Sequence, residues 1–503
     1  MHKSINFTSI FLLCRLVTFA QADGDRLAKE SRQAKELMAE RKFAEAIPIY
    51  EHLVKAVPGN PGLLLNLALA EEMAGRPVRA IPHFEAVLKM QPNSVPALLS
   101  LSMARLQLGQ TKEAIGPLRR LIALQPDNLN ALGMLAGAEL NENRFANAAE
   151  HYRQITAKEE GDPRAWYGLG KAYERLASGA FEKLNKSAPQ SAYVAVLLAD
   201  TRLQRRQFRS AFFFYKEAQK TMPEMRGLHA GLAMVYRQTE HADWASEEQN
   251  REDGLPAPDC KLKAAECAFL AGHFLDAVRN VSATASAETL FWATRAYNQL
   301  ANLAFEHLSQ LPESVQIHAL KAQTFQDHRQ PLEAVTEWKA ALKLAPDDGQ
   351  IKRELAAALF SAKDYQGVMP LAEELLAQAP KEAELNYLMG ASLWRSEQAE
   401  KGLPYLELAV QEDANLLPAE AALGLALAAL NKDAQGIPHL KKALALDDDG
   451  SMHYSLARAY RAAGETKLAS EAMQEYQKIQ KQNREVNDEL AKEAEISAPG
   501  ERQ

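Results

Sequence analysis

The sequence predicts an all-α protein built as an α-solenoid of about 14 stacked helix-turn-helix units. Four alanines, each next to another apolar residue, stand 34 residues apart: Ala46, Ala80, Ala114 and Ala148. Three prolines follow the first three of these alanines at a constant distance of twelve residues: Pro58, Pro92 and Pro126. A fixed period of about 20 to 50 residues is typical of repeat proteins, in which each unit packs only against its neighbours. Proline at the same place in successive units indicates where one helix pair ends and the next begins.

Composition and charge restrict the class of partner. The chain has 503 residues, is 47% hydrophobic and carries a formal net charge of −7. Without residues 1–22, which contain Lys3 and Arg15, 56 basic side chains remain against 65 acidic ones, a net charge of −9. Proteins that bind nucleic acid present basic surfaces, so this balance argues against a nucleic-acid partner.

The first 22 residues resemble a secretory signal peptide. An apolar stretch from Ile10 to Phe19 follows a short basic start, and Ala20-Gln21-Ala22 forms a small-x-small cleavage site. We therefore expect cleavage before Asp23 and an exported protein, periplasmic or secreted. Arg15 interrupts the apolar stretch, and a leader that does not function would leave the protein in the cytoplasm. Cys14 suggests a lipoprotein signal as an alternative, but Leu13 before it is larger than the usual residue.

One segment carries a recognisable signature. In "WYGLGKAY", Trp166, Leu169, Gly170 and Tyr173 lie at spacings that place them on one helical face. The pattern W-x2-L-G-x2-Y, followed by alanine and proline, resembles that of the tetratricopeptide repeat family over nearly the whole chain after residue 22. The resemblance implies a right-handed superhelix, protein or peptide partners, and a concave groove lined by the first helix of each pair.

The resemblance also implies which side chains face the groove, namely those beside the packing leucine of each first helix. Aromatic and arginine residues at such positions are typical of peptide hot spots. The alternative is that several of them only pack between repeats. The candidate partner-binding residues are Tyr167, Lys171, Arg175, Tyr193, Phe291, Arg295, Tyr387, Trp394, Tyr454, Arg458 and Arg461.

Two segments depart from the repeat in the same way. The stretch from Tyr173 to Ser191 matches that from Tyr297 to Ser314, and both are short and lack the polar turn between helices. The least repeat-like region lies between them and contains Pro256 and Pro258, which indicate a hinge. The predicted organisation is a signal peptide at 1–22, a solenoid half at 23–255, a second half at 256–483, and a capping extension with a frayed tail at 484–503.

Two cysteines remain after residue 22, Cys260 and Cys267. In one continuous helix, seven residues would separate their Cα atoms by about 10.5 Å, beyond the ~7 Å limit for a disulfide. Two prolines before Cys260 favour a turn that folds back on Cys267, and an oxidising compartment would favour the bond. Two buried thiols are the alternative.

No catalytic motif, phosphate-binding glycine loop or cofactor motif occurs in the sequence, and we expect no enzyme activity, cofactor or metal. His241, Asp243 and Glu247 have helical spacing that a metal site could use, but a solvated polar face explains them better. The runs ending at Gly349 and Gly450 resemble fragments of calcium loops, and helix capping explains them better. The predicted function is a non-catalytic interaction scaffold at the cell envelope; the alternative is an accessory subunit of an envelope enzyme or export complex.

Overall fold

The computed structural model describes residues 25–279, 281, 285–491 and 496–499. The regular structure of these residues is helical, in agreement with the predicted all-α class. The chain divides into two compact units, Met1–Leu176 and Ala177–Gln503. The sequence predicted a boundary between two solenoid halves at residues 255–256, which is not the division after Leu176. That boundary stays a prediction.

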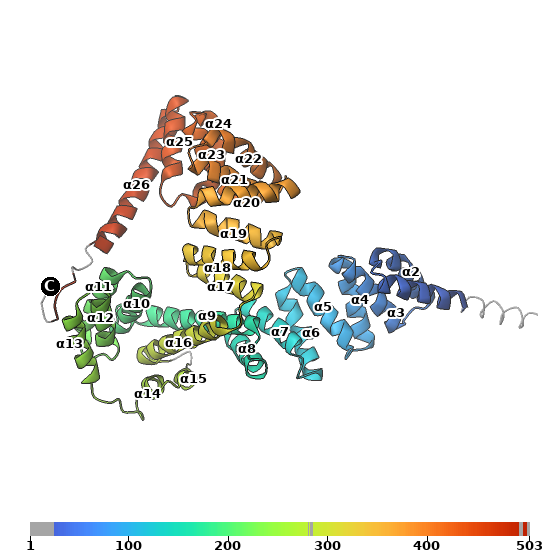
Figure 1. The fold of residues 1–503 in the computed structure, drawn as a ribbon, viewed down its shortest axis with the longest axis horizontal. Coiled ribbons are helices and arrows are strands. Elements are labelled where there is room, and N and C mark those ends of the chain that lie inside the picture. The colour runs from blue at the N-terminus through green and yellow to red at the C-terminus, as the bar shows by residue number, and fades with distance from the viewer. Residues whose placement is uncertain (1–24, 280, 282–284, 492–495, 500–503) are drawn as a thin grey trace, which may run out of the picture. The chain divides into compact units, whose positions relative to one another are not determined.

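The described residues of the first unit form four helix pairs, followed by the beginning of α9 (Figure 1). Residues 25–39 are helical and precede the first labelled helix. The helices that follow are α2 (Phe43–Ala56), α3 (Pro61–Met73), α4 (Pro77–Met90), α5 (Val95–Gln107), α6 (Thr111–Leu124), α7 (Leu129–Asn141), α8 (Phe145–Lys158) and α9 (Pro163–Ser187), the last of which runs on into the second unit.

The second unit continues with helix pairs of the same kind, and consecutive helices pack against each other. After α9 the unit begins with α10 (Ala192–Gln204), α11 (Phe208–Thr221), α12 (Leu228–Gln238), α13 (Ala242–Asp253), α14 (Ala264–Leu270), α15 (Phe274–Ala277) and α16 (Ala287–Gln310). They are followed by α17 (Val315–Asp327), α18 (Pro331–Leu344), α19 (Gly349–Ser361), α20 (Tyr365–Gln378), α21 (Ala383–Arg395), α22 (Ala399–Glu412), α23 (Leu417–Ala429), α24 (Asp433–Ala443), the short 3-10 helix η1 (Leu444–Leu446), α25 (Ser451–Ala462) and α26 (Thr466–Ala491).

The alanines that set the period lie where helices pack. Ala46, Ala80, Ala114 and Ala148 fall on the second helix of successive pairs, and all four are completely buried. The prolines fall in the loops between pairs, as predicted. Since the four sites are close-packed, a larger side chain there would force helices apart.

The turn inside each helix pair also follows the repeat. Near the end of each first helix one residue adopts a left-handed backbone conformation, which reverses the chain before the second helix. Glycine accepts this conformation without strain at Gly75 and Gly109, whereas other units use a residue with a side chain. The positions with positive φ include Arg41, Gly75, Gly109 and Asn143 in the first unit and Arg329, Lys363, Glu397 and Asn431 in the second, again at intervals of 34 residues.

Two predicted helix pairs are single helices instead. The unit with the clearest sequence signature forms one helix of 25 residues, α9, and its match near residue 300 forms one of 24 residues, α16. The sequence already lacked turn residues at both places, and without a left-handed residue the helix continues through the expected turn. The expectation of a helix-turn-helix pair in the unit that carries the tetratricopeptide signature is therefore wrong.

The expectation that units contact only their sequence neighbours is also wrong at one place. α16 packs against α10 and α14, and α10 and α16 belong to units well separated in the sequence. The Tyr193 and Phe291 rings from these two helices have centroids 5.2 Å apart. One hydrophobic cluster extends from Leu184 to Trp292, so this part of the unit folds around a common core.

Glycines allow the closest helix approaches. A methyl group on Gly390 of α21 would lie 2.8 Å from the carbonyl oxygen of Gly402 of α22, and one on Gly402 would lie 2.6 Å from the carbonyl oxygen of Gly390. One of the two contacts recurs 34 residues later, where a methyl group on Gly436 of α24 would lie 2.9 Å from the carbonyl oxygen of Gly424 of α23. These backbones can approach closely only because no Cβ separates them.

We predict that Gly390→Ala lowers the free energy of unfolding by about 1 to 3 kcal/mol, because the added methyl group must push two backbones apart. Urea unfolding followed by circular dichroism measures the change. Gly116→Ala in α6 is the matched control, since nothing lies within 4 Å of its added methyl group. The control should stabilise the protein by up to about 1 kcal/mol. Equal stability of the Gly390 variant and the wild type would contradict the close crossing.

Candidate functional site

A hollow of about 230 Å³ lies over the first helices α19, α21 and α23. These three helices pack side by side, as the family's groove geometry requires. Tyr387 and Trp394, two of the predicted residues, line the hollow together on α21. The other lining residues are Phe360, Tyr365, Ala391, Arg395, Pro418, Ala421, Ala422 and Leu425. We call this hollow the aromatic pocket.

Aromatic contacts organise the aromatic pocket. The Phe360 ring lies 5.5 Å from the rings of both Tyr365 and Tyr387, and the Arg395 guanidinium lies 4.3 Å from the Trp394 ring. Burial raises the pKa of Tyr387, and the nearby Arg395 charge opposes that rise, so its hydroxyl is neutral at physiological pH and available as a hydrogen-bond donor. The pocket thus offers apolar ring surface, a hydroxyl donor and a cation.

A second hollow, of about 490 Å³, is formed by α10, α16, the α11–α12 loop and the segment from Leu255 to Lys263. We call it the loop pocket. Tyr193, Met225, Leu262 and Trp292 supply apolar lining, and Leu262 is 84% exposed. The predicted residues Tyr193 and Phe291 both belong to this pocket.

Ion pairs hold the wall of the loop pocket. The Nε atom of Arg226 lies 3.3 Å from Glu266, and the same guanidinium donates hydrogen bonds to the carbonyl oxygens of Leu255 and Pro256. The Lys263 ammonium group lies 3.1 Å from Glu266 and 3.3 Å from Glu288. The two cations are therefore engaged by the pocket's own carboxylates and backbone.

The structure joins Cys260 and Cys267 in a disulfide, with Cα atoms 5.6 Å apart. Helix α14 begins at Ala264, so Cys260 lies outside the helix in the turn that the two prolines favoured. The disulfide closes the segment that lines the loop pocket. Of the two sequence alternatives, the structure contains the bonded pair.

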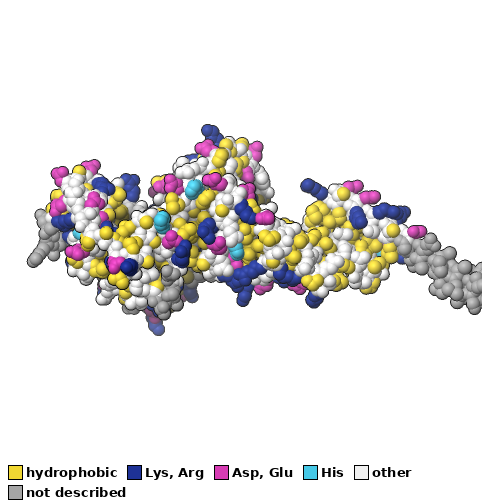
Figure 2. Space-filling model, turned by 90° about the horizontal axis from the view of Figure 1, so that it is seen from below, with side chains coloured by type: hydrophobic (Ala, Val, Ile, Leu, Met, Phe, Trp, Pro, Cys, Tyr) yellow, Lys and Arg dark blue, Asp and Glu magenta, His cyan; other side chains and the backbone are white. Residues whose placement is uncertain are grey.

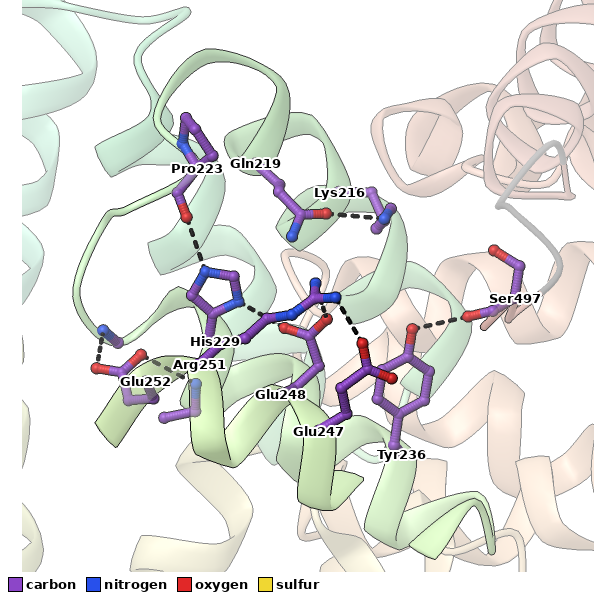
Figure 3. A network of polar contacts seen from close by, with 12 residues as sticks. Lys216, Gln219, Pro223, His229, Tyr236, Glu247, Glu248, Arg251, Glu252 and Ser497 are labelled. Carbon is purple, nitrogen blue, oxygen red and sulfur yellow. Dashed lines mark hydrogen bonds and ion pairs between the residues drawn. The ribbon is translucent and has the colours of Figure 1, made fainter. Parts of the chain in front are cut away.

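A buried polar network positions the α11–α12 loop (Figure 3). The Nδ1 atom of His229 lies 2.5 Å from Glu248 and its Nε2 atom lies 2.8 Å from the Pro223 carbonyl oxygen. Glu252 accepts hydrogen bonds from the backbone N–H groups of Gly227 and Ala230 at the start of α12. Both partners of the His229 ring are acceptors, so the geometry suits a doubly protonated imidazolium.

The neighbouring carboxylate charges also favour the doubly protonated form of His229. Burial lowers its pKa, but the hydrogen bond and charge of Glu248, the Pro223 carbonyl and the charge of Glu252 outweigh burial and raise the pKa above 6.5. Arg251 faces Glu248 from the other side, at 3.0 Å. Since Pro223 lines the loop pocket, the network connects the charge of His229 to the pocket wall.

Pairs of histidine and carboxylate recur along the chain, a feature that we did not predict. In each pair Nδ1 of the histidine lies within 2.9 Å of a carboxylate oxygen. The spacing from Glu71 to His83 equals that from Glu139 to His151, two periods later, which is a signal that the sequence contained. The pairs with a buried member are His83–Glu71, His151–Glu139, His229–Glu248, His318–Glu337, His439–Glu420 and His453–Asp447.

One predicted partner-binding residue has a buried side chain. Phe291 is completely buried, because α16 packs face to face against α10 instead of bordering an open groove. Arg295 lies one turn further along α16, ion-paired to Asp200 at 3.1 Å and stacked over Phe291. Tyr215 donates a hydrogen bond to the same Asp200. Phe291 therefore packs in the core at the wall of the loop pocket, and its part in partner binding stays a prediction.

The other predicted residues lie on separate helices. Tyr167, Lys171 and Arg175 are on α9, where Lys171 pairs with Glu174 at 2.7 Å. Tyr454, Arg458 and Arg461 are on α25. Arg458 is bound to the Ala428 carbonyl oxygen and to Asp433, and the Tyr454 ring lies 5.4 Å from that of Tyr476. Of the predicted set, the structure brings together Tyr193 with Phe291 and Arg295, and Tyr387 with Trp394.

The residues considered for metals have structural roles. His241 stacks on Trp244 with ring centroids 4.2 Å apart. Asp348 caps α19 by accepting from the N–H groups of Gln350 and Ile351, and Asp447 accepts from those at the start of α25. Within the part of the chain that the structure describes, no group of three or more metal-ligating side chains occurs. The capping explanation of the two acidic runs is thus confirmed.

Family comparisons agree with the helix pairs. Models described as tetratricopeptide repeat match residues 31–95 and 320–383, and two further matches cover 72–138 and 106–172. Together with the paired helices, these matches show that residues 31–172 and 320–383 are built of tetratricopeptide repeats. No curated protein matches the chain.

Several solved structures share the repeat. A tetratricopeptide repeat protein from Parabacteroides merdae is 12% identical over 66% of this chain and 98% of its own, with a TM-score of 0.30. MamA from Desulfovibrio magneticus is 23% identical over 34% of this chain and 97% of its own, with a TM-score of 0.30. YrrB, described as having an unusual peptide-binding site, is 20% identical over 35% of this chain and 92% of its own, with a TM-score of 0.29. These likenesses concern the fold and carry no argument about function.

Surface composition is mixed on the face drawn in Figure 2, where acidic and basic side chains alternate with hydrophobic ones. Among the helices of the described residues, none combines the length and the hydropathy needed to cross a membrane. The predicted cleavage site and Cys14 lie outside the described residues.

We predict that Glu248→Gln lowers the free energy of unfolding by about 2 kcal/mol at low pH, where His229 of the native protein is charged and the variant lacks its carboxylate partner. A raised folded-state pKa stabilises the fold below the unfolded pKa of about 6.5, and this contribution is lost as the pH rises through the folded pKa. The deficit of the variant should therefore shrink above that pKa. Urea titrations between about pH 5.5 and pH 8.5 measure it.

Glu247→Gln is the matched control, because Glu247 is an exposed neighbour that also pairs with Arg251. An exposed pair contributes about 1 kcal/mol or less, so the control should change little at any pH. A deficit of the Glu248 variant that is constant with pH would show that the network does not depend on the charge of His229.

Proposed function

We propose that the protein is a non-catalytic scaffold that binds a peptide segment of a partner protein in the aromatic pocket. The observation that carries the proposal is the joining of Phe360, Tyr387, Trp394 and Arg395 in one hollow over three first helices. Clusters of aromatic and arginine side chains in a concave site are the usual anchors of protein recognition.

The repeat explains why the pocket lies there. Phe360 and Trp394 occupy equivalent positions one period apart on α19 and α21, and Ala421 takes the place of Tyr387 one period later on α23. The change from tyrosine to alanine leaves space beside the two rings. A partner side chain that fills this space would be apolar, and a carboxylate beside it would complement Arg395.

We also propose that the scaffold acts outside the cytoplasm, in the cell envelope. Two observations support this: the signal-like residues 1–22, and the disulfide between Cys260 and Cys267, since disulfides persist mainly in oxidising compartments. The acidic composition supports protein partners over nucleic acid. A partner captured from envelope extracts that proves to be an enzyme would favour the accessory-subunit alternative.

We predict that the double substitution Tyr387→Ala and Trp394→Ala weakens partner binding at least about thirtyfold, because truncating a buried aromatic anchor costs about 2 kcal/mol or more. The partner captured by pull-down is titrated against each variant by calorimetry, and circular dichroism verifies the fold. Val78→Ala with Leu332→Ala is the control, since both side chains are more than two-thirds exposed on second helices. If the control pair abolishes binding and the pocket variant binds normally, recognition uses the second helices and the proposal is wrong.

We predict a mature N-terminus at Asp23 when the chain is produced with its own leader. Intact-mass analysis of the purified protein tests this directly. A mass that includes Met1 to Ala22 would rule out cleavage, and with it the signal-peptide argument for the cell envelope.

A further inference from the structure

The C-terminal segment Ile496–Pro499 lies on the helices α11 to α13. The hydroxyl of Tyr236 on α12 donates a hydrogen bond of 2.7 Å to the backbone carbonyl oxygen of Ser497, across 261 residues of sequence (Figure 3). All four residues of the segment are half-buried, and Ile496 packs against the hydrophobic cluster that contains Tyr236. A frayed tail was expected within residues 484–503, but chain ends become ordered where contacts tie them down.

The surface beneath the segment is aromatic and rigid. Tyr236 is 1% exposed, and its ring lies 5.8 Å from that of Phe212 and 5.6 Å from that of Trp244. His241 stacks on Trp244 and lies edge-on to Tyr236. Because these rings pack against one another, the Tyr236 hydroxyl is held in position to receive a ligand.

The contacts define the class of ligand. The hydrogen bond goes to a main-chain carbonyl, which every peptide offers, and specificity must come from the side chains around it. In the segment an aliphatic residue, Ile496, is followed by two small residues and by Pro499, which favours an extended backbone before it. Aromatic-lined surfaces are a common receptor for extended, proline-containing peptides.

We propose that the surface formed by Tyr236, His241 and Trp244, here called the tail site, is a peptide-binding site whose resident ligand is the chain's own segment Ile496–Pro499. A tethered ligand acts at a local concentration in the millimolar range, so a separate peptide of the same kind must displace it. The tail site uses other helices than the aromatic pocket, and the inference does not depend on the proposed function.

Hydrogen exchange tests the resident ligand in the full chain. Deletion of residues 492–503, and separately Ile496→Asp, should increase amide exchange in α12 and α13. Deletion of residues 500–503 is the control, since it retains the segment that makes the contacts. Unchanged exchange in α12 and α13 in both variants would overturn the proposal.

Peptide binding tests the ligand class. A labelled peptide of residues 492–503 should bind the chain shortened by those residues at least about tenfold more tightly than the full chain, because the tethered segment competes. Tyr236→Phe in the shortened chain should weaken binding about fivefold, as expected for one neutral hydrogen bond. Tyr50→Phe, at a tyrosine equally buried in the first unit, should leave the affinity unchanged.

Two results of the peptide experiment would reject the proposal. Equal affinity of the peptide for the full and the shortened chain would mean that the tail site is not occupied by the segment. A peptide carrying Ile496→Asp that binds as well as the native peptide would mean that the site does not recognise the aliphatic residue. Circular dichroism of each variant separates these outcomes from loss of the fold.

Discussion

The close approach of paired helices is the constraint on which the rest of the structure depends. At several crossings the backbones are separated by a buried alanine, such as Ala46 or Ala80, or by a pair of glycines, such as Gly390 and Gly402. Interiors are packed as densely as organic crystals, so the size of the residue at a crossing sets the distance between helices. Every later feature, including both pockets, lies on surfaces whose spacing these crossings determine.

Polar pairs hold the helices at the spacing that the crossings allow. A buried carboxylate such as Glu71 or Glu139 is flanked by a histidine and an arginine from the same or neighbouring pairs. Removing one partner of such a pair leaves a charge buried without compensation, which costs far more than the pair contributes. In the second unit His229, which is paired with a buried carboxylate in the same way, also contacts the Pro223 carbonyl oxygen in the α11–α12 loop. Because Pro223 lines the loop pocket, this packing contact also positions part of the pocket wall.

The core was largely predictable and the sites only in part. The period located the buried alanines and the loops with proline, since both follow from local rules that repeat with the unit. Tyr387 and Trp394 were predicted on α21, but Phe360 was missed although it stands one period before Trp394. Phe291 was predicted at a groove position from its place within the helix. Only the packing of α16 against α10 shows that it is buried.

The sequence by itself determined the class of fold, the length of the unit and the residues at the helix crossings, because each depends on interactions within one unit or between adjacent ones. Tertiary structure decided what depends on distant segments: the packing of α10 with α16 and the contact of Ser497 with Tyr236. No repeat period encodes these contacts. They form where the chain departs from the repeat, at the continuous helices α9 and α16 and at the C-terminal segment.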